Sequence, residues 1–517
     1  TGQQAFSGAT SAVIFDAILN KAPTPVLSLN PGVPAELVRV INKCLEKESD
    51  LRYQGANELL SDLKRLRRDT ASGRMPAAEA RTASEKSLAV LYLGNTSGDK
   101  EDEYFRDGIT EDIITELSKI KELRVFPLSA VAVYREKPVA EPQVGEQLKA
   151  AYVMSGSIRR AGARLRLTAR LVETRTGHTV WAERYDRQLE DVFAIQDEIA
   201  HSIAHALELA LTEKEKVAIG KAATADVRAY DYYLRGRQFF HQFRRKGFEF
   251  AQQMFERAIE IDPKYARAYA GIADCCSFLY GSFQASPQNL EKADEASHRA
   301  LELDPELAEA HAARGLALSL RKKHAEAIGE FESAIRLDPS LFEAYYFYGR
   351  TLFEAGNMEQ SARMFEQAQR VNPEDFQAPS LLAQAYQNLG RTTDCAAAHR
   401  RALEIIRRHV ELHSDDARAL YLGANALSHL GERQQALDWN ERALAIDSTD
   451  PGILYNVACV YSVLGEPNRA IDCLERSIAF GRKQLEWMQN DSDLDPLRNH
   501  PRFRALLESL QSDPQQQ

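Results

Sequence analysis

The feature that most constrains this chain is a 34-residue spacing. Prolines at Pro305, Pro339 and Pro373 each follow a helix-like stretch, and both intervals between them are 34 residues long. Aromatic side chains recur in register within the two intervals, at Phe331 and Phe365. A fixed period of this length is typical of stacked helix pairs. The spacing therefore predicts an α-helical repeat array that serves binding, and it does not identify a partner.

The same pattern extends in both directions along the chain, so that we expect about seven repeats over residues 224–480. Pro263 and Pro305 are 42 residues apart, which predicts an insertion in the second repeat, around residues 281–287. Residues 481–517 are expected to form capping helices and a tail. In each repeat, glycine or alanine lets two helices approach closely, an aromatic ring fills the gap, and proline ends the second helix.

These small, aromatic and proline positions resemble tetratricopeptide repeats. The resemblance implies an α-α superhelix whose first helices line a concave groove for proteins or peptides. An equally weighted alternative is that the tyrosines among the groove positions pack between repeats. The basic residues with which chaperone-binding members clamp a C-terminal carboxylate are not found at the matching positions, so chaperone tails are not expected as partners. Counting from each repeat's glycine projects eight side chains into the groove: Tyr346, Arg350, Gln384, Gln387, Asn388, Tyr421, Asn425 and Tyr455.

Residues 1–70 resemble the end of the C-lobe of a bacterial-type serine/threonine protein kinase. The resemblance is carried by Phe6, the helix pattern of residues 12–19, Cys-Leu-Glu-Lys at 44–47 and Leu-Arg-Tyr at 51–53. In that family the arginine matched by Arg52 has a structural role, because it pairs with a glutamate at the end of the activation segment. That glutamate is missing from this chain. The resemblance predicts a kinase remnant, and a small unrelated helical domain is the alternative.

The residues that a kinase needs for phosphoryl transfer are also missing. The chain has no glycine-rich phosphate loop, strand lysine, catalytic-loop aspartate or metal-binding aspartate in a kinase arrangement. We therefore expect no catalytic residue and no cofactor in this chain, and expect ATP and magnesium only for a kinase core upstream of Thr1. The sequence starts without methionine, which favours such an upstream portion.

Residues 71–86 are predicted to be a flexible linker, because they contain almost no apolar side chains. Residues 87–215 are predicted to form a small α/β domain with a trailing helix. Three stretches, at 104–112, 156–160 and 181–186, resemble the TolB-like N-terminal domain that accompanies bacterial kinases, nucleotide cyclases and transcription regulators. The resemblance implies a non-catalytic interaction or sensory module. Its strands are expected at 88–93, 123–128, 152–159, 164–173 and 178–185, and its helices at 110–120 and 143–149.

Other chemistries are disfavoured. The glycine-containing loop at 94–99 lacks the Gly-Lys-Ser/Thr of a phosphate-binding loop, and predicts an ordinary turn. The histidine pairs at 201 and 205 and at 409 and 413 lack the glutamate placement of a zinc protease, which favours surface or packing roles over metal ligation. A net charge of -10 gives no reason to expect nucleic acid, and no apolar run is long enough to span a membrane.

The fold class that we expect is multidomain and mainly α: a kinase C-lobe fragment, a small TolB-like α/β domain and a repeat superhelix. The leading hypothesis for function is a protein-interaction and regulatory region of a bacterial serine/threonine kinase, which recruits substrates or regulators. The rival hypothesis is a stand-alone repeat adaptor without kinase parentage. Scattered cysteines and the absence of a secretory signal favour a reducing, cytoplasmic setting.

Overall fold

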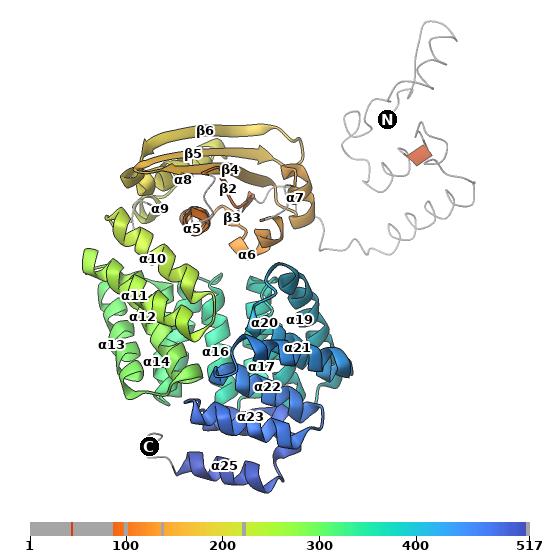
Figure 1. Cartoon of the computed structure of the whole chain (residues 1–517). Coiled ribbons are helices and arrows are strands. Elements are labelled where there is room, and N and C mark those ends of the chain that lie inside the picture. Colours follow the sequence, from red (N-terminus) through yellow and green to blue (C-terminus); the bar gives the residue numbers. More distant parts are fainter. Residues whose placement is uncertain (1–42, 45–85, 98–101, 136–138, 220–223, 513–517) are drawn as a thin grey trace, which may run out of the picture. The chain divides into compact units, whose positions relative to one another are not determined.

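The structure is a computed structural model that describes residues 43–44, 86–97, 102–135, 139–219 and 224–512. The predicted kinase-like segment, including Arg52, and the predicted linker lie outside the described residues apart from residues 43, 44 and 86. Residues 85–517 form one compact unit, which contains a small mixed sheet with its helices and a long array of paired helices (Figure 1). The described part of the chain is mainly α-helical.

The sheet combines short parallel strands with a long antiparallel meander. Its strand order is β3-β1-β4-β5-β6, with β2 paired to β4. β1 runs parallel to β3 and β4, whereas β4, β5 and β6 are antiparallel neighbours. All four residues of β1 are buried, as expected for a strand covered on both faces. The strands are β1 Ser87–Val90, β2 Gly94–Asn95, β3 Arg124–Val125, β4 Tyr152–Ala161, β5 Arg164–Glu173 and β6 Thr179–Gln188.

Helices pack against the sheet to form two apolar clusters. Residues of α5 and α8 pack with Leu165, Leu167 and Leu171 of β5. On β1 and β4, Ala89 and Val153 belong to a second cluster, which includes residues of α6 and α7. The alternation of buried and exposed residues along β5 places its leucines on one face, which is the period-2 pattern of a half-covered strand. The helices are α5 Glu103–Ser118, α6 Leu128–Val131, α7 Glu141–Leu148, α8 Val192–Ala206 and α9 Glu213–Ile219.

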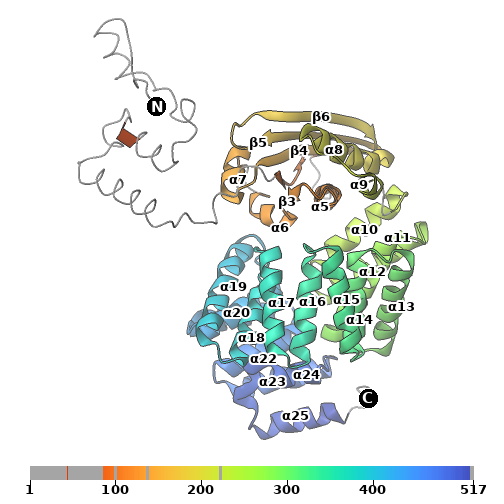
Figure 2. The same cartoon turned by 180° about the vertical axis from the view of Figure 1, so that it is seen from behind.

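The array contains seven antiparallel helix pairs within residues 224–512, which stack side by side (Figures 1 and 2). In the second pair a π-helical turn, Leu279–Phe283, lies where the sequence predicts an insertion. The pairs are α10 Val227–Phe240 with α11 Arg245–Ile261, α12 Ala266–Phe278 with α13 Pro287–Leu303, α14 Ala308–Leu320 with α15 His324–Leu337, α16 Phe342–Glu354 with α17 Met358–Val371, α18 Gln377–Asn388 with α19 Thr392–Leu412, α20 Ala417–His429 with α21 Arg433–Ile446, and α22 Pro451–Val463 with α23 Pro467–Ala479.

Glycine and phenylalanine face each other inside these pairs, as the repeat pattern predicts. A methyl group on Gly315 would lie 2.7 Å from the Phe331 ring, and one on Gly349 would lie 2.8 Å from the Phe365 ring. Both rings are fully buried. The glycines are therefore required because the ring of the second helix occupies the space that a side chain on the first helix would take.

The chain after α23 differs from the predicted capping region. It forms α24 Leu485–Asn490, a 3-10 segment η6 Ser492–Leu497 and α25 Pro501–Gln511. α25 lies against α23, in the position of a cap. The segment η6 instead packs against α18 and α22, and α24 packs against α16. Residues 485–497, hereafter the return segment, therefore lie inside the array, because their side chains bond to residues of several repeats.

Polar contacts join the sheet domain to the first helix of the array. Asp231 of α10 accepts hydrogen bonds from Tyr104 Oη at 2.7 Å and from Arg160 Nη1 at 2.8 Å. Tyr230 of α10 donates to the carboxylate of Asp112 on α5. One apolar cluster continues from α5 and α8 into the first helix pair. The two parts therefore share a core.

Candidate functional site

The concave side of the array encloses a cavity of about 560 Å³. Six of the eight predicted groove side chains line it, and they come from the first helices of four consecutive pairs, α16, α18, α20 and α22. The side chains that were assigned to the groove by counting from each repeat's glycine therefore mostly surround one cavity. The six residues are Tyr346, Arg350, Gln384, Tyr421, Asn425 and Tyr455.

Gln387 and Asn388 do not line the cavity, which differs from the sequence prediction. Asn388 lies one helical turn beyond Gln384, donates to the Gln384 carbonyl at 3.0 Å and reaches Ser492 Oγ at 3.5 Å. The return segment covers this level of the groove, and Asn388 is left exposed beside it. Gln387 is half-buried, and its buried Oε1 has no hydrogen-bond partner.

The sequence left open whether the tyrosines line the groove or pack between repeats, and in the structure they do both. Tyr346 and Tyr455 are each 1% exposed, so that they pack between helices and present little more than their hydroxyl edges to the cavity. The Tyr346 ring stacks on Phe342 and contacts Phe365 of the same repeat. Removing either tyrosine would therefore disturb the fold as well as the cavity wall.

Two aspartates of the return segment accept hydrogen bonds from three of the predicted groove residues. Asp493 accepts hydrogen bonds from Gln384 Nε2 at 3.0 Å and from Asn425 Nδ2 at 2.6 Å. Asp491 accepts one from Tyr455 Oη at 2.6 Å. Both aspartates are fully buried. The amide and phenol donors that the sequence assigned to a partner peptide are thus partly used within the chain.

The hydrogen bonds between the return segment and the first helices of the repeats form a buried junction. Three of its residues were not identified from the sequence: Asp491, Asp493 and His429. His429 Nε2 lies 2.7 Å from Asp493 Oδ1, and its ring stacks on His399 with centroids 4.6 Å apart. The available signal was the Asp-Ser-Asp-Leu-Asp run at 491–495, an acidic stretch that is unusual in a segment otherwise expected to cap an apolar repeat. This stretch lies outside the periodic repeats, so counting from each repeat's glycine could not assign its residues to the groove.

The two buried aspartates have pKa values shifted in opposite directions. Burial and the neighbouring charge of Asp493 raise the pKa of Asp491. Burial also acts to raise the pKa of Asp493, but the His429 charge and the donated hydrogen bonds hold it below its usual value. For His429, burial opposes the charged form, yet the Asp493 carboxylate raises its pKa. The contact therefore favours the imidazolium form of His429 and the carboxylate form of Asp493, whereas the pKa of Asp491 is raised to about 7.

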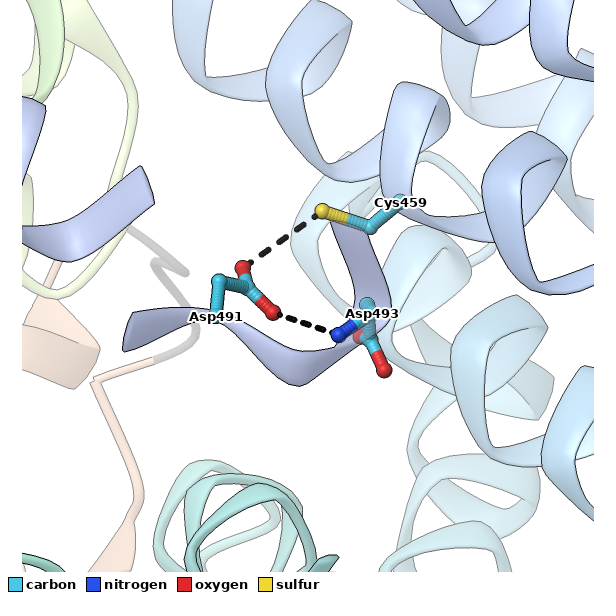
Figure 3. Close-up of side chains that lie close together, drawn as sticks. All are labelled: Cys459, Asp491 and Asp493. Carbon is cyan, nitrogen blue, oxygen red and sulfur yellow. Dashed lines mark hydrogen bonds between the residues drawn. The ribbon is translucent and has the colours of Figure 1, made fainter. Parts of the chain in front are cut away.

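Cys459, Asp491 and Asp493 bring possible metal-ligand atoms within 4.8 Å of one another (Figure 3). The cysteine thiol points to Asp491 Oδ2 at 3.6 Å, and the Asp493 amide donates to Asp491 Oδ1 at 3.1 Å. Burial raises the pKa of the Cys459 thiol well above its usual value, which keeps it protonated and a poor ligand. Because protein donors already occupy the carboxylate oxygens, this group fits a hydrogen-bonded junction better than a metal site.

The histidine pairs singled out in the sequence do not assemble into a site among the described residues. His201 and His205 are both exposed on α8. His409 Nε2 lies 2.8 Å from Asp416, and its ring is 4.7 Å from that of His413. These contacts fit surface and packing roles.

Comparisons with known families identify the array. Models described as tetratricopeptide repeat match residues 288–341, 318–385 and 387–451. The array is therefore built from tetratricopeptide repeats, which suggest binding to proteins. A model described as the second domain of HilA/YgeH-like transcriptional regulators matches residues 84–202, where the sequence suggested a TolB-like domain. Neither that resemblance nor the kinase resemblance is supported by these matches.

One curated relative is a putative adenylate cyclase 3 of Rhizobium meliloti (strain 1021), which is 41% identical over 212 residues. The match covers 41% of this chain and 36% of that protein, so it spans about a third of the relative's length. None of the described helices is long and apolar enough to cross a bilayer.

Several solved structures match parts of this chain at low sequence identity. The type IV pilus biogenesis factor PilW is 20% identical, with a TM-score of 0.31 over 42% of this chain and 92% of its own. The Cut9–Hcn1 hetero-tetramer of APC/C is 15% identical, with a TM-score of 0.37 over 62% and 53%. YrrB, a repeat protein with an unusual peptide-binding site, is 22% identical, with a TM-score of 0.24 over 39% and 95%.

Proposed function

We propose that this chain is a recognition region that binds a protein partner through the concave cavity of its tetratricopeptide array. The observation that carries the proposal is the convergence of six predicted groove side chains, from four consecutive helix pairs, on one cavity of about 560 Å³. Concave pockets that combine aromatic rings with a few fixed polar groups are the usual sites of recognition in proteins. The return segment forms one wall of this pocket and fixes its shape.

The sheet domain is proposed to be a non-catalytic interaction or sensory module that acts together with the array. Its docking on α10 through Asp231 and Tyr230 supports mechanical coupling, because a change in the sheet domain would move the first helix of the array. The match to a domain of transcriptional regulators supports a regulatory role for the sheet domain, whatever its ligand.

Catalysis is proposed to belong to another part of a longer protein. The kinase resemblance of residues 1–70 favours a serine/threonine kinase parent, with ATP and magnesium bound in that core. The relative named as a putative adenylate cyclase supports a signalling enzyme more generally, and a stand-alone adaptor fits the array equally well. The coding sequence upstream of Thr1 discriminates these settings. The 517-residue chain, incubated with ATP and magnesium, is expected to form neither phosphoprotein nor cyclic AMP.

Filling the cavity tests the recognition role. Leu422 of α20 lines the cavity and is half-buried, whereas Leu337, at the end of α15, is 40% exposed and lies away from it. Full-length wild type, Leu422→Trp and Leu337→Trp are used for affinity capture from a lysate of the source organism, with quantitative mass spectrometry. Proteins recovered by wild type and Leu337→Trp are expected to be lost with Leu422→Trp. Equal recovery by all three would contradict the proposal.

A further inference from the structure

Three arginines from separate elements face the cavity. Arg350 lies on α16, Arg418 on α20 and Arg482 between α23 and α24. Arg350 Nη1 at 3.4 Å and Arg418 Nη2 at 3.1 Å both donate to the hydroxyl of Tyr346, so two guanidinium groups converge on one phenol. The Arg482 guanidinium stacks over the Tyr455 ring, 4.2 Å from its centroid. The cavity wall thus contains three guanidinium groups that contact its tyrosines.

None of these three arginines has an ion pair with a carboxylate among the described residues. Arg482 is only 5% exposed, and its buried Nε has no hydrogen-bond partner. Burial, together with the nearby Arg350 charge, lowers the pKa of Arg482. The Nε of Arg418 is also buried without a partner. The charges of Asp375 and Asp416 help to raise the pKa of Arg418, so the cation that lacks a nearby counter-charge is Arg482. Burying such a cation is costly to the folded protein, which favours a role for Arg482 in binding an anionic group.

The carboxylates that line the same cavity are already satisfied by other groups. Asp416 contacts His409 at 2.8 Å, and Asp491 accepts from Tyr455. The remaining ones have local partners: Glu249 with Arg245 at 3.0 Å, Asp447 with Thr449 Oγ1 at 2.7 Å, and Asp450 with the Ile453 amide at 2.9 Å. The lining carries six basic side chains against these five carboxylates, so its formal charge is positive although the whole chain carries a net charge of -10. The six are Arg244, Arg245, Lys246, Arg350, Arg418 and Arg482.

The return segment shows how this groove holds acidic residues. It places two buried aspartates against amide, imidazole and phenol donors of α18, α20 and α22, next to the arginine-lined part. Guanidinium groups bind carboxylates more strongly than neutral amides do, because the hydrogen bonds are charge-assisted. A volume of about 560 Å³ lies in the range of pockets that enclose a ligand of several side chains' size.

We propose that the cavity binds an acidic peptide segment of the partner protein, with its carboxylates held by Arg350, Arg418 and Arg482. This inference rests on the proposed recognition function and names the chemistry of the partner. The segment would bind beside Asp491–Asp493 of the chain itself, and its side-chain carboxylates would pair with Arg350, Arg418 and Arg482, of which Arg482 lacks a nearby counter-charge.

Fluorescence anisotropy with a labelled hexaglutamate peptide tests the proposal, with hexaglutamine as the neutral control. Wild-type full chain is expected to bind hexaglutamate and not hexaglutamine. Arg482→Met and Arg350→Met are each expected to weaken hexaglutamate binding roughly tenfold or more, whereas the exposed Arg336→Met is expected to leave it unchanged. Arg482→Lys, which keeps the charge, is expected to recover part of the affinity.

The free protein supplies a second readout. Because Arg482 is a buried and unpaired cation, Arg482→Met is expected to keep or raise the thermal midpoint while it loses peptide binding. Equal hexaglutamate affinity of wild type and the arginine variants, or no hexaglutamate binding to wild type, would overturn the acidic-peptide assignment. Binding of citrate or inorganic phosphate, but not of the peptide, would overturn it in favour of a small anion. In either case, loss of captured partner with Leu422→Trp would still support the recognition function.

Discussion

Asn425 donates a hydrogen bond from its side-chain amide to Asp493 over 2.6 Å, although 68 residues separate the two in the chain. Asn425 belongs to the sixth helix pair, and Asp493 belongs to the return segment. The contact closes the concave face at one level and leaves the arginine-lined cavity open beside it. It converts an open groove into a pocket with a wall made by the chain's own C-terminal part.

Replacing Asp493 tests how much the contacts of the return segment contribute to the stability of the fold. Asp493→Ala leaves the buried donors of Gln384, Asn425 and His429 without an acceptor, and we expect a loss of about 3–5 kcal/mol in the free energy of unfolding. Urea denaturation followed by circular dichroism measures the change. Asp495→Ala in the same segment is the control, because the Asp495 side chain is 65% exposed and is expected to change stability by less than about 1 kcal/mol. Equal midpoints for the two variants would contradict the role of Asp493.

The His429–Asp493 pair predicts a dependence of stability on pH. Asp493 raises the pKa of His429 above its usual value of 6.5, so the folded state binds this proton more tightly than the unfolded state does. The stabilisation is complete below pH 6.5 and is lost as the pH rises through the raised value. Asp493 has a lowered pKa, so its own contribution is present above pH 3.8 and is lost only in more acidic solution.

His429→Gln isolates this effect, because glutamine can donate to Asp493 but does not titrate. Thermal midpoints of wild type and His429→Gln are measured from pH 5.5 to pH 9. The advantage of wild type over the variant is expected to be largest at the acidic end and to shrink as the pH rises. A difference that is constant across this range, or that grows with pH, would show that His429 is not protonated in the folded protein.

The packing of glycine against phenylalanine predicts a large effect of a core truncation. Phe331→Ala opens a cavity opposite Gly315 and is expected to cost about 3–5 kcal/mol. Phe250→Ala removes the same atoms from a ring that is 48% exposed on α11, and is expected to cost much less. Denaturation of both variants alongside wild type measures the difference. Similar losses at the two positions would mean that the repeat ring does not fill a tightly packed site.

The junction between the sheet domain and the array predicts a change in cooperativity. Asp231→Ala removes the acceptor of Tyr104 and Arg160, and is expected to uncouple the two parts so that calorimetry resolves two transitions or a broadened one. Asp186→Ala removes an exposed pair with Arg166 inside the sheet and is expected to leave the transition unchanged. A single sharp transition for Asp231→Ala at the wild-type midpoint would contradict the coupling.

Much of the sheet domain follows from local pattern. The long strands β4, β5 and β6 lie within three residues of the predicted spans. Gly162 and Gly177 mark the turns between them, and β5 also shows the alternation of buried and exposed residues that marks a half-covered strand. β3 is much shorter than its predicted span, and the two-residue β2 was not predicted, since a strand so short has no period to detect. The strand order also could not be read from the sequence, because it depends on pairings between β1 and two strands far along the chain.

The sequence by itself determined the repeat array, because each 34-residue unit carries its own small residues, ring and helix-ending proline, and each unit packs mainly on its neighbours. Only the tertiary structure decided what fills the concave face. Asp491 and Asp493 reach Gln384, Asn425 and Tyr455 across 36 to 109 residues, and no repeat period records such contacts. The same long-range packing brings Arg350, Arg418 and Arg482 to one cavity, and these guanidinium groups carry the proposed specificity of the pocket for acidic peptides.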